Sequence, residues 1–217
     1  MKLKGVIFDL DGTLADTIPV CVAACREAIQ QYTGRCMSDE EIVALFGPSE
    51  VGIISRLVPD RWEECLATYM SLYEKAHERC RAVFPGVDTI LELLQRRAVR
   101  LGIVTGKGKE SAAISLKYLG LANHFDAIET GSPEGDIKAP SIQKILAKWR
   151  AEPERVAYVG DSPSDVKAAK VAGVMALGAA WAATSNFDQL NGAAPFAIFP
   201  TTESFADWIQ ENIERNR

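Results

Sequence analysis

Two aspartates stand two residues apart near the start of the chain, in the segment Asp9-Leu-Asp11-Gly12-Thr13, directly after a short apolar run. Carboxylates this close repel each other when both are ionised, so the pair predicts a bound cation or a shared proton. Hard divalent ions prefer oxygen ligands of this kind. Taken alone, the segment is also compatible with a solvated Asp-Gly turn.

A second acidic segment repeats this pattern later in the chain. The apolar run Val156-Ala157-Tyr158-Val159 is followed closely by Asp161, and a further carboxylate, Asp165, stands four residues beyond it. Ser162 followed by Pro163 predicts the start of a helix. Asp165 then falls in the first helical turn, where a negative charge also favours the helix itself. Asp161 is therefore a candidate metal ligand, while Asp165 has both a functional and a purely structural interpretation.

Donors suited to phosphate oxygens lie between the two acidic segments. Thr105 and Gly106 follow the apolar run Leu101-Gly-Ile-Val104, and they offer a hydroxyl and a flexible backbone. Lys138 opens a helical pattern, where a cation opposes the helix dipole and so suggests another role. A solvated lysine is the alternative interpretation of Lys138.

The elements that would position these residues alternate along the chain. Short apolar runs bounded by turn residues predict buried strands at Gly5–Phe8, Leu101–Val104, Ala127–Ile128, Val156–Val159, Val174–Leu177 and Phe196–Phe199. Helical patterns lie at Val87–Arg97, Glu110–Leu119, Ser141–Trp149, Asp165–Val171 and Glu203–Ile213. This alternation predicts an α/β fold, a doubly wound parallel sheet with helices on both faces. Ligands of such sheets bind at the carboxyl ends of the strands.

The interval from residue 16 to residue 83 breaks this alternation. It offers no strand-like run and predicts several amphipathic helices, with a capping box at Ser38-Asp-Glu-Glu41 and a long helix through Trp62, Leu66, Tyr69 and Tyr73. We therefore predict an inserted α-helical cap domain at 16–83 and an α/β catalytic core made of 1–15 and 84–217. The alternative is that these helices belong to a layer of the core.

The composition excludes several classes of partner. The 217 residues carry a formal net charge of −5 without a long block of Lys or Arg, which argues against binding to a nucleic acid polymer. No segment is apolar enough to cross a membrane, and charges come too early for a signal peptide, so we expect a soluble, cytoplasmic protein. The five cysteines form no C-x-x-C pair, which favours reduced thiols. The oligomeric state stays open.

The chemical segments, in this order, resemble the motifs of the haloacid dehalogenase superfamily of phosphohydrolases, whose core is Rossmann-like. The matching segments are Asp9–Thr13 for the first motif, Thr105-Gly106 for the second, Lys138 for the third and Gly160–Asp165 for the fourth. The resemblance extends from Lys4 to about Leu177, with the helical insertion at the position of the family's cap. The chain departs from many relatives at Gly106, where Asn is frequent, and at Ala139, which separates Lys138 from Pro140. These departures concern the substrate and the subfamily more than the chemistry.

The resemblance implies a mechanism with named roles. Asp9 is the nucleophile that becomes an aspartyl phosphate, and Asp11 is the general acid and base. Mg²⁺ would be held by Asp9, by the backbone carbonyl of Asp11 and by Asp161. Thr105, Gly106 and Lys138 would bind the phosphate, while Asp165 would orient Lys138 or a water on the metal. The resemblance favours a small phosphomonoester, phosphoglycolate-like, as the substrate, and closure of the cap over this small phosphorylated metabolite would gate hydrolysis.

The same residues bear on several alternative activities. Inorganic pyrophosphatase and nucleotide or sugar-phosphate phosphatase stay open as alternatives. The resemblance disfavours a dehalogenase because Asp11 is present, a phosphomutase because no His follows the first motif, and a phosphonate-cleaving enzyme because Lys75 has an ordinary solvated explanation. A non-catalytic binding protein is disfavoured because the clustered charges are intact. A phosphate-accepting signalling receiver would lack both Asp11 and the insertion.

Overall fold

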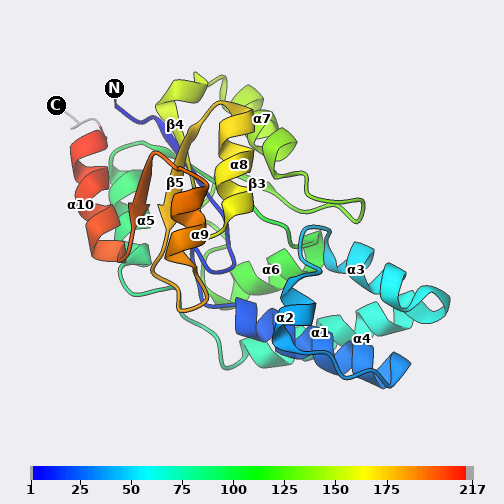
Figure 1. The fold of residues 1–217 in the computed structure, drawn as a ribbon. Coiled ribbons are helices and arrows are strands. Elements are labelled where there is room, and N and C mark those ends of the chain that lie inside the picture. Colours follow the sequence, from blue (N-terminus) through cyan, green and yellow to red (C-terminus); the bar gives the residue numbers. More distant parts are fainter. Residues whose placement is uncertain (1, 214–217) are drawn as a thin grey trace.

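The computed structural model describes residues 2–213. Within that range the chain forms a parallel sheet of six strands in the order β3-β2-β1-β4-β5-β6 (Figure 1). The strands are β1 (Gly5–Phe8), β2 (Arg100–Val104), β3 (Ala127–Glu129), β4 (Val156–Gly160), β5 (Met175–Ala179) and β6 (Ala197–Phe199). This confirms the predicted fold class, a doubly wound parallel α/β sheet.

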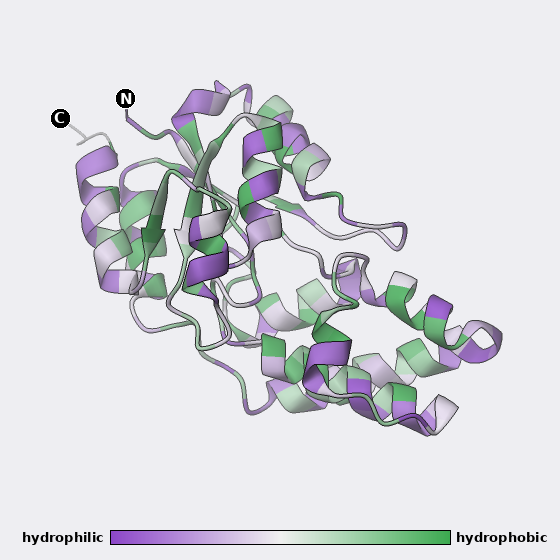
Figure 2. Ribbon diagram, viewed as in Figure 1, coloured by the Kyte–Doolittle hydropathy of each residue, from purple (hydrophilic) through white to green (hydrophobic). Residues whose placement is uncertain are grey.

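Helices cover both faces of the sheet, as the side-chain alternation of the strands requires. In β1, Val6 and Phe8 belong to one hydrophobic cluster and Ile7 to another, so each face has its own core. The first cluster includes residues of α5 (Val87–Arg96), α6 (Lys109–Tyr118) and α10 (Thr202–Asn212). The second includes residues of α7 (Lys138–Trp149), α8 (Pro163–Ala172) and α9 (Phe187–Gly192). Figure 2 shows polar residues on the outer sides of these helices.

The first four helices after β1 gather beside the carboxyl ends of the strands (Figure 1). They are α1 (Ile18–Thr33), α2 (Asp39–Val43), α3 (Glu50–Leu57) and α4 (Trp62–His77), with a 3₁₀ turn at Pro59–Arg61. A third hydrophobic cluster, which includes Cys25, Ile42, Ile54, Tyr69 and Tyr73, holds them together. The capping box predicted at Ser38 and Glu41 is present at the start of α2. The assignment of 16–83 as a separate cap domain stays a prediction.

The register of the strands brings the chemical segments to one edge of the sheet. Phe8 of β1 is paired with Ile103 of β2 on one side and with Val159 of β4 on the other. The segments that follow these three strands therefore leave the sheet side by side. The chain runs outward from β1 to β3 and then returns to β4, so this edge contains the switch point at which doubly wound sheets bind ligands.

Two local features differ from the sequence-based expectation. Helix α7 begins at Lys138, three residues before the predicted start at Ser141. The short helix α9 was not predicted, because only one of its six residues, Leu190, is buried and such a helix leaves almost no apolar periodicity. No helix within the described residues has the length and apolar character needed to cross a membrane.

Candidate active site

Asp9, Lys138 and Asp165 form a buried ion-pair network at the end of β1. The Nζ atom of Lys138 donates to Asp9 Oδ2 at 2.9 Å and to Asp165 Oδ1 at 2.6 Å. Tyr158 of β4 also donates to Asp165 Oδ1, at 3.0 Å. The other carboxylate oxygen of Asp165 accepts hydrogen bonds from the backbone and hydroxyl of Ser162, which caps α8 as the sequence predicted. Asp165 is thus fully engaged with protein donors and holds Lys138 toward Asp9.

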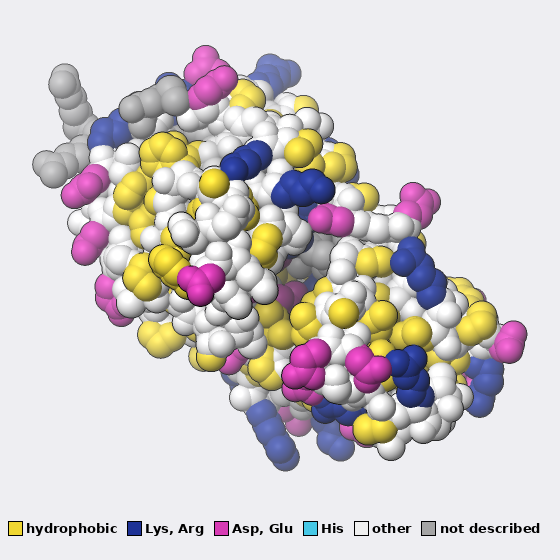
Figure 3. All heavy atoms as spheres, in the orientation of Figure 1, with side chains coloured by type: hydrophobic (Ala, Val, Ile, Leu, Met, Phe, Trp, Pro, Cys, Tyr) yellow, Lys and Arg dark blue, Asp and Glu magenta, His cyan; other side chains and the backbone are white. Residues whose placement is uncertain are grey.

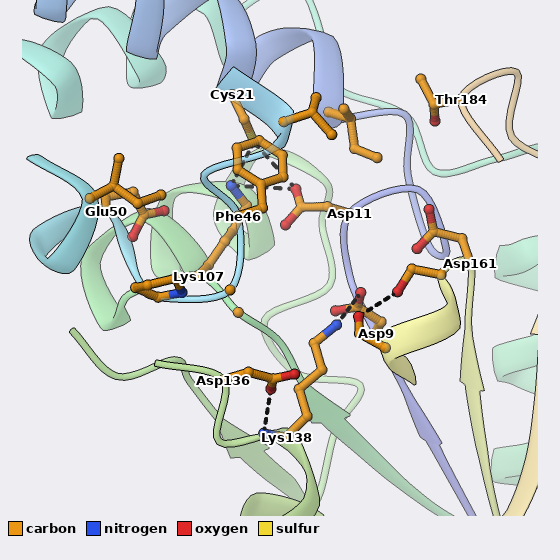
Figure 4. Close-up of a pocket in the computed structure, with 18 of the residues that line it drawn as sticks. Asp9, Asp11, Cys21, Phe46, Glu50, Lys107, Asp136, Lys138, Asp161 and Thr184 are labelled. Atoms are coloured by element: carbon orange, nitrogen blue, oxygen red, sulfur yellow. Dashed lines mark hydrogen bonds and ion pairs between the residues drawn. The ribbon is translucent and has the colours of Figure 1, made fainter. Parts of the chain in front are cut away.

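Asp161 reaches the same centre from the end of β4 (Figure 4). Thr13 donates a long hydrogen bond of 3.4 Å to Asp161 Oδ1. Gly12 allows this approach: its φ is +74°, and a Cβ added there would lie 2.4 Å from Asp161 Oδ2. Both the left-handed backbone and the close contact therefore require glycine at this turn.

Burial and crowding of like charges perturb the ionisation of this centre. Burial, reinforced by the charges of Asp165 and Asp11, raises the pKa of Asp9 to about 7 although Lys138 opposes the shift. Burial also raises the pKa of Asp161 well above its usual range, with Asp165 and Asp9 adding to the effect. For Lys138, burial acts to lower the pKa, but the carboxylates of Asp165 and Asp9 outweigh it and raise the pKa. The negative charges of the three aspartates therefore outnumber the positive charge of Lys138 in this centre.

The donor set fits a divalent cation. Carboxylate oxygens of Asp9, Asp161 and Asp165 lie within 4.8 Å of one another, and the ammonium of Lys138 pairs with two of them, Asp9 and Asp165. Among the described residues, Asp9 Oδ1 is buried and accepts no hydrogen bond. An unpartnered buried carboxylate oxygen is costly unless a cation or a substrate atom occupies the adjacent space. An all-oxygen site of this charge suits a hard divalent metal.

Asp11 lies in a different environment from Asp9, although only one residue separates them. Its Oδ1 accepts a 2.5 Å hydrogen bond from Thr17, the residue before α1, and lies 3.3 Å from the ammonium of Lys107. Lys107 is buried, donates to Cys21 Sγ at 3.0 Å and stands 4.1 Å from the centroid of the Tyr73 ring. Figure 4 shows Asp11 and Lys107 facing each other below Cys21. The charge of Asp11 raises the pKa of Lys107 even though burial opposes it.

The sequence did not predict that Lys107 contacts Asp11. Its position two residues after Thr105 was a weak signal, because a lysine in a loop is usually solvated. Thr105 itself is buried, and its hydroxyl accepts a hydrogen bond from the backbone N–H of Lys107 at 3.2 Å. Gly106 lines the cavity described below, whereas Thr105 is not among its lining residues. The structure thus brings Gly106 and Lys107 to the cavity, with Thr105 supporting them from beneath.

A cavity of about 510 Å³ lies over these residues, between the strand ends and the helical segment. Asp9, Asp11, Lys138 and Asp161 contribute to its wall on the sheet side. Residues of α1, α2, α3 and α4 line the opposite side, and Gln189 of α9 lies at its margin. Figure 3 shows the surface hollowed between the two parts. Substrate entering this cavity would meet the acidic centre at its base.

The fold and the acidic site together define a phosphohydrolase built on a doubly wound sheet. Comparison with known proteins supports this class. The sequence profile described as haloacid dehalogenase-like hydrolase matches residues 6–179. The chain is 31% identical to pyrophosphatase PpaX of Bacillus pumilus over 181 residues, which is 82% of this chain and 84% of that protein. It is 30% identical to pyrophosphatase PpaX of Halalkalibacterium halodurans over 176 residues, 80% and 82% of the two chains.

Solved structures agree with these matches. A haloacid dehalogenase-like family hydrolase from Streptococcus pneumoniae superposes with a TM-score of 0.78 at 26% identity, covering 96% of this chain and 99% of that one. A structure described as a predicted phosphoglycolate phosphatase from Haemophilus somnus gives a TM-score of 0.82 at 21% identity, covering 96% and 98%, and shows a shared fold. The chain belongs to the haloacid dehalogenase-like hydrolase family. It is a phosphohydrolase, and the family generally uses a divalent metal.

Proposed function

We propose that this protein is a Mg²⁺-dependent phosphatase that hydrolyses a small phosphomonoester through an aspartyl phosphate, an acyl phosphate formed on Asp9. The observation that carries the proposal is the state of the Asp9 carboxylate. One oxygen, Oδ2, is held by Lys138, and the other, Oδ1, is buried without a hydrogen-bond partner among the described residues. A fixed carboxylate with one free oxygen at the base of a cavity is arranged for attack on phosphorus.

The reaction divides into two displacements at phosphorus. In the first, Asp9 Oδ1 forms a bond to phosphorus while the bond to the ester oxygen breaks, and Asp11 transfers a proton to that leaving oxygen. In the second, Asp11 takes a proton from water, the water oxygen bonds to phosphorus, and Asp9 is released together with inorganic phosphate. Thr17 and Lys107 hold Asp11 Oδ1, so its other oxygen, Oδ2, is the one placed to exchange the proton.

The remaining site residues support these steps by charge and position. Asp9, Asp161 and the backbone carbonyl of Asp11 would hold the magnesium ion, which when bound reduces the repulsion between the phosphate and the carboxylate that attacks it. Lys138 and the amide-bearing loop at Thr105 and Gly106 would bind the phosphoryl oxygens. Asp165 orients Lys138 through the 2.6 Å hydrogen bond and is a positioning residue.

We further propose that residues 16–83 act as a cap that closes over the substrate. Contacts between α3 and the sheet part support this role. The backbone N–H of Ser49 donates to the carbonyl of Ser132 at 2.8 Å, and Glu50 accepts from the N–H of Gly108 at 2.7 Å and from Ser111 at 2.6 Å. Together with the hydrogen bonds between α4 and α6, such as Tyr73–Ser115, these contacts join the cap to the sheet part. Exchange of substrate and product would require the contacts of α3 to open.

Inorganic pyrophosphatase is the second candidate, because the relatives from Bacillus pumilus and Halalkalibacterium halodurans bear that name. In either case the partner is a small phosphorylated metabolite rather than a polymer. We propose that the enzyme acts in the cytoplasm.

Phosphate release from a panel of phosphomonoesters and pyrophosphate, each with Mg²⁺ and with excess chelator, tests the activity. We expect metal-dependent release from the wild type and none above background from Asp9→Asn, because an amide oxygen is a poor nucleophile. Asp207→Asn, an exposed aspartate of α10, is the matched control and should retain full activity. Substantial turnover by a folded Asp9→Asn enzyme would refute the covalent role.

Binding of the metal can be measured without turnover. We expect Mg²⁺ to raise the Tm of the wild-type protein in proportion to the logarithm of its concentration once the site is saturated, since a ligand that binds only the folded state stabilises it. Asp161→Asn should weaken this dependence, whereas Asp207→Asn should leave it unchanged. An identical Mg²⁺ response in the Asp161→Asn variant would exclude Asp161 as a ligand.

A further inference from the structure

The two sides of the cavity differ sharply in polarity. The sheet side contributes the acidic centre, whereas the helical segment contributes a nearly continuous apolar wall. The side chains that form most of this wall are Ile18, Val43, Phe46, Ile53, Ile54 and Tyr69. A phosphoryl group bound at Asp9 would have its leaving group directed away from the strand ends, toward this wall. The wall is therefore the part of the protein that selects the leaving group.

Among the described residues, no unpaired cation lines the cavity. Its cationic lining residues are Lys107 and Lys138, and both are already paired with carboxylates, Lys107 with Asp11 and Lys138 with Asp9 and Asp165. No arginine between residues 2 and 213 belongs to the lining. Arg56, on the same helix as Ile53 and Ile54, donates instead to the backbone carbonyls of Pro133 and Glu134. A second anionic group on the substrate would therefore find no free positive partner on the helical side.

Two acidic side chains at the cavity further disfavour a leaving group that carries a negative charge. Glu50 and Asp136 also line the cavity. Both oxygens of Glu50 accept hydrogen bonds, from Gly108 and from Ser111, so this carboxylate is fixed in place. A carboxylate or a second phosphate on the leaving group would be desolvated beside these charges without compensation, which is strongly unfavourable.

Two large apolar side chains at the cavity are exposed to solvent. Phe46 is 42% exposed and Val43 is 45% exposed, and both belong to the lining. Figure 3 shows apolar side chains along the edge of the helical part next to the hollow. Exposed apolar surface that continues a concave wall is typical of a surface that a ligand covers.

We infer that the substrate is a phosphomonoester whose leaving group is uncharged and largely apolar, an alkyl or aryl alcohol, rather than pyrophosphate or a carboxylate-bearing ester such as phosphoglycolate. This inference rests on the proposed function and narrows its substrate class. The phosphate is held by the charged base of the cavity, and the alcohol portion is held by the wall around Phe46 and Ile54. Binding of the apolar portion favours hydrolysis because it fixes the ester oxygen next to Asp9 and Asp11.

A homologous series of substrates tests the inference directly. We expect kcat/KM to rise from ethyl to hexyl phosphate by about fourfold per added methylene until the wall is covered. Propyl phosphate should exceed phosphoglycolate, which is similar in size but carries a carboxylate, by at least about tenfold. A flat dependence on chain length, or the highest kcat/KM for pyrophosphate or phosphoglycolate, would overturn the inference and leave the proposed phosphatase intact. Absence of Mg²⁺-dependent release from every compound would remove the proposed function and this inference with it.

A matched pair of variants locates the effect at the wall. Phe46→Arg places a cation at the cavity, and Phe196→Arg makes the same change at a side chain that is 66% exposed and outside the lining. For Phe46→Arg we expect kcat/KM to fall about tenfold or more on hexyl phosphate, to change little on ethyl phosphate and to rise on phosphoglycolate. Phe196→Arg should leave all three values unchanged. Equal effects on all substrates, or equal effects of the two variants, would contradict the role of the wall.

Binding of a non-hydrolysable probe gives a readout that is independent of turnover. Titration calorimetry at several temperatures should give a more negative heat-capacity change for hexylphosphonate than for methylphosphonate, because the longer chain buries more apolar surface. In Phe46→Arg the difference between the two probes should shrink. Equal heat-capacity changes for both probes with the wild-type protein would show that the wall does not contact the chain.

Discussion

Asp9 and Asp11 show how two identical side chains in one turn acquire different surroundings. Asp9 faces Lys138 and the carboxylates of Asp161 and Asp165, and one of its oxygens is left free. Asp11 faces the opposite way, toward Thr17 and Lys107. Different environments for paired carboxylates are what a division between nucleophile and proton carrier requires. Lys107 therefore becomes a positioning residue for Asp11, although it touches no reacting atom in the proposed mechanism.

Replacement of Lys107 tests this positioning role. Lys107→Met should lower kcat for an alkyl phosphate by about tenfold to a hundredfold, because Asp11 loses the cation that holds its Oδ1. The loss should be much smaller for p-nitrophenyl phosphate, since p-nitrophenolate leaves without needing a proton. Lys107→Arg keeps the positive charge and should recover part of the kcat for the alkyl phosphate. Lys117→Met removes an exposed lysine of α6 and should change kcat for neither substrate. A uniform loss on both substrates would indicate a structural role alone.

Helix α3 is one of the elements that connect the helical segment to the sheet part, beside α4, which contacts α6. Its first residue, Glu50, satisfies the N-terminal N–H of Gly108 and the hydroxyl of Ser111, and so caps α6 from a distant part of the chain. Gly52 packs so closely on the loop before α7 that an added Cβ would lie 2.1 Å from the carbonyl oxygen of Pro133. Arg56 completes the contact with that loop. The apolar wall is therefore positioned by these contacts of α3 together with those of α4, whose Tyr73 hydroxyl is hydrogen-bonded to Ser115 of α6 at 2.8 Å.

Removal of the Glu50 carboxylate should loosen that connection. Glu50→Ala is expected to reduce the free energy of unfolding by about 1–2 kcal/mol, the usual effect of losing a helix cap. It should also raise KM more than it lowers kcat, because the wall binds the leaving group. Urea denaturation measures the change in the free energy of unfolding, and steady-state kinetics measures KM and kcat. Hydrogen exchange at the amides of 108–111 should rise as the cap of α6 is lost. Glu63→Ala, an exposed first-turn residue of α4, is the control, and the same losses in both variants would contradict the capping role.

The described part of the molecule contains three hydrophobic clusters, and the one in the helical segment includes three of the five cysteines. Cys21, Cys25 and Cys65 are buried in it, whereas Cys36 is exposed. Burial raises the pKa of the Cys25 thiol to about 12, so almost no thiolate is present near neutral pH. Cys65 is fully buried and does not line the cavity, so access of a reagent to Cys65 reports opening of the helical segment.

Alkylation measured by peptide mass spectrometry tests this packing. In native protein at pH 8, iodoacetamide should modify Cys36 at least about a hundredfold faster than Cys25 or Cys65, because reaction needs both access and a thiolate. In urea above the unfolding midpoint the rates at the three sites should converge. Comparable native rates at Cys36 and Cys65 would show that the helical segment does not form the compact cluster described above.

Local sequence patterns were sufficient to predict the strands and the acidic turns that follow them. A parallel strand buried on both faces is a continuous apolar run, and the residue at its end is read directly from the chain, which is why the positions of Asp9 and Asp161 relative to the sheet were predictable. Helix α9 and the start of α7 were missed or misplaced, because their ends depend on contacts with other elements more than on periodicity.

The sequence by itself therefore determined the fold class, the family resemblance and the edge of the sheet at which chemistry occurs. Only the tertiary structure decided which charges meet. Lys138 reaches Asp9 across 129 residues of chain, and Lys107 reaches Cys21 across 86. It also decided the apolar character of the cavity wall, because helix periodicity cannot distinguish an apolar side chain that fills a core from one that faces a ligand. Such contacts are set by how separate elements pack, and no local pattern records them.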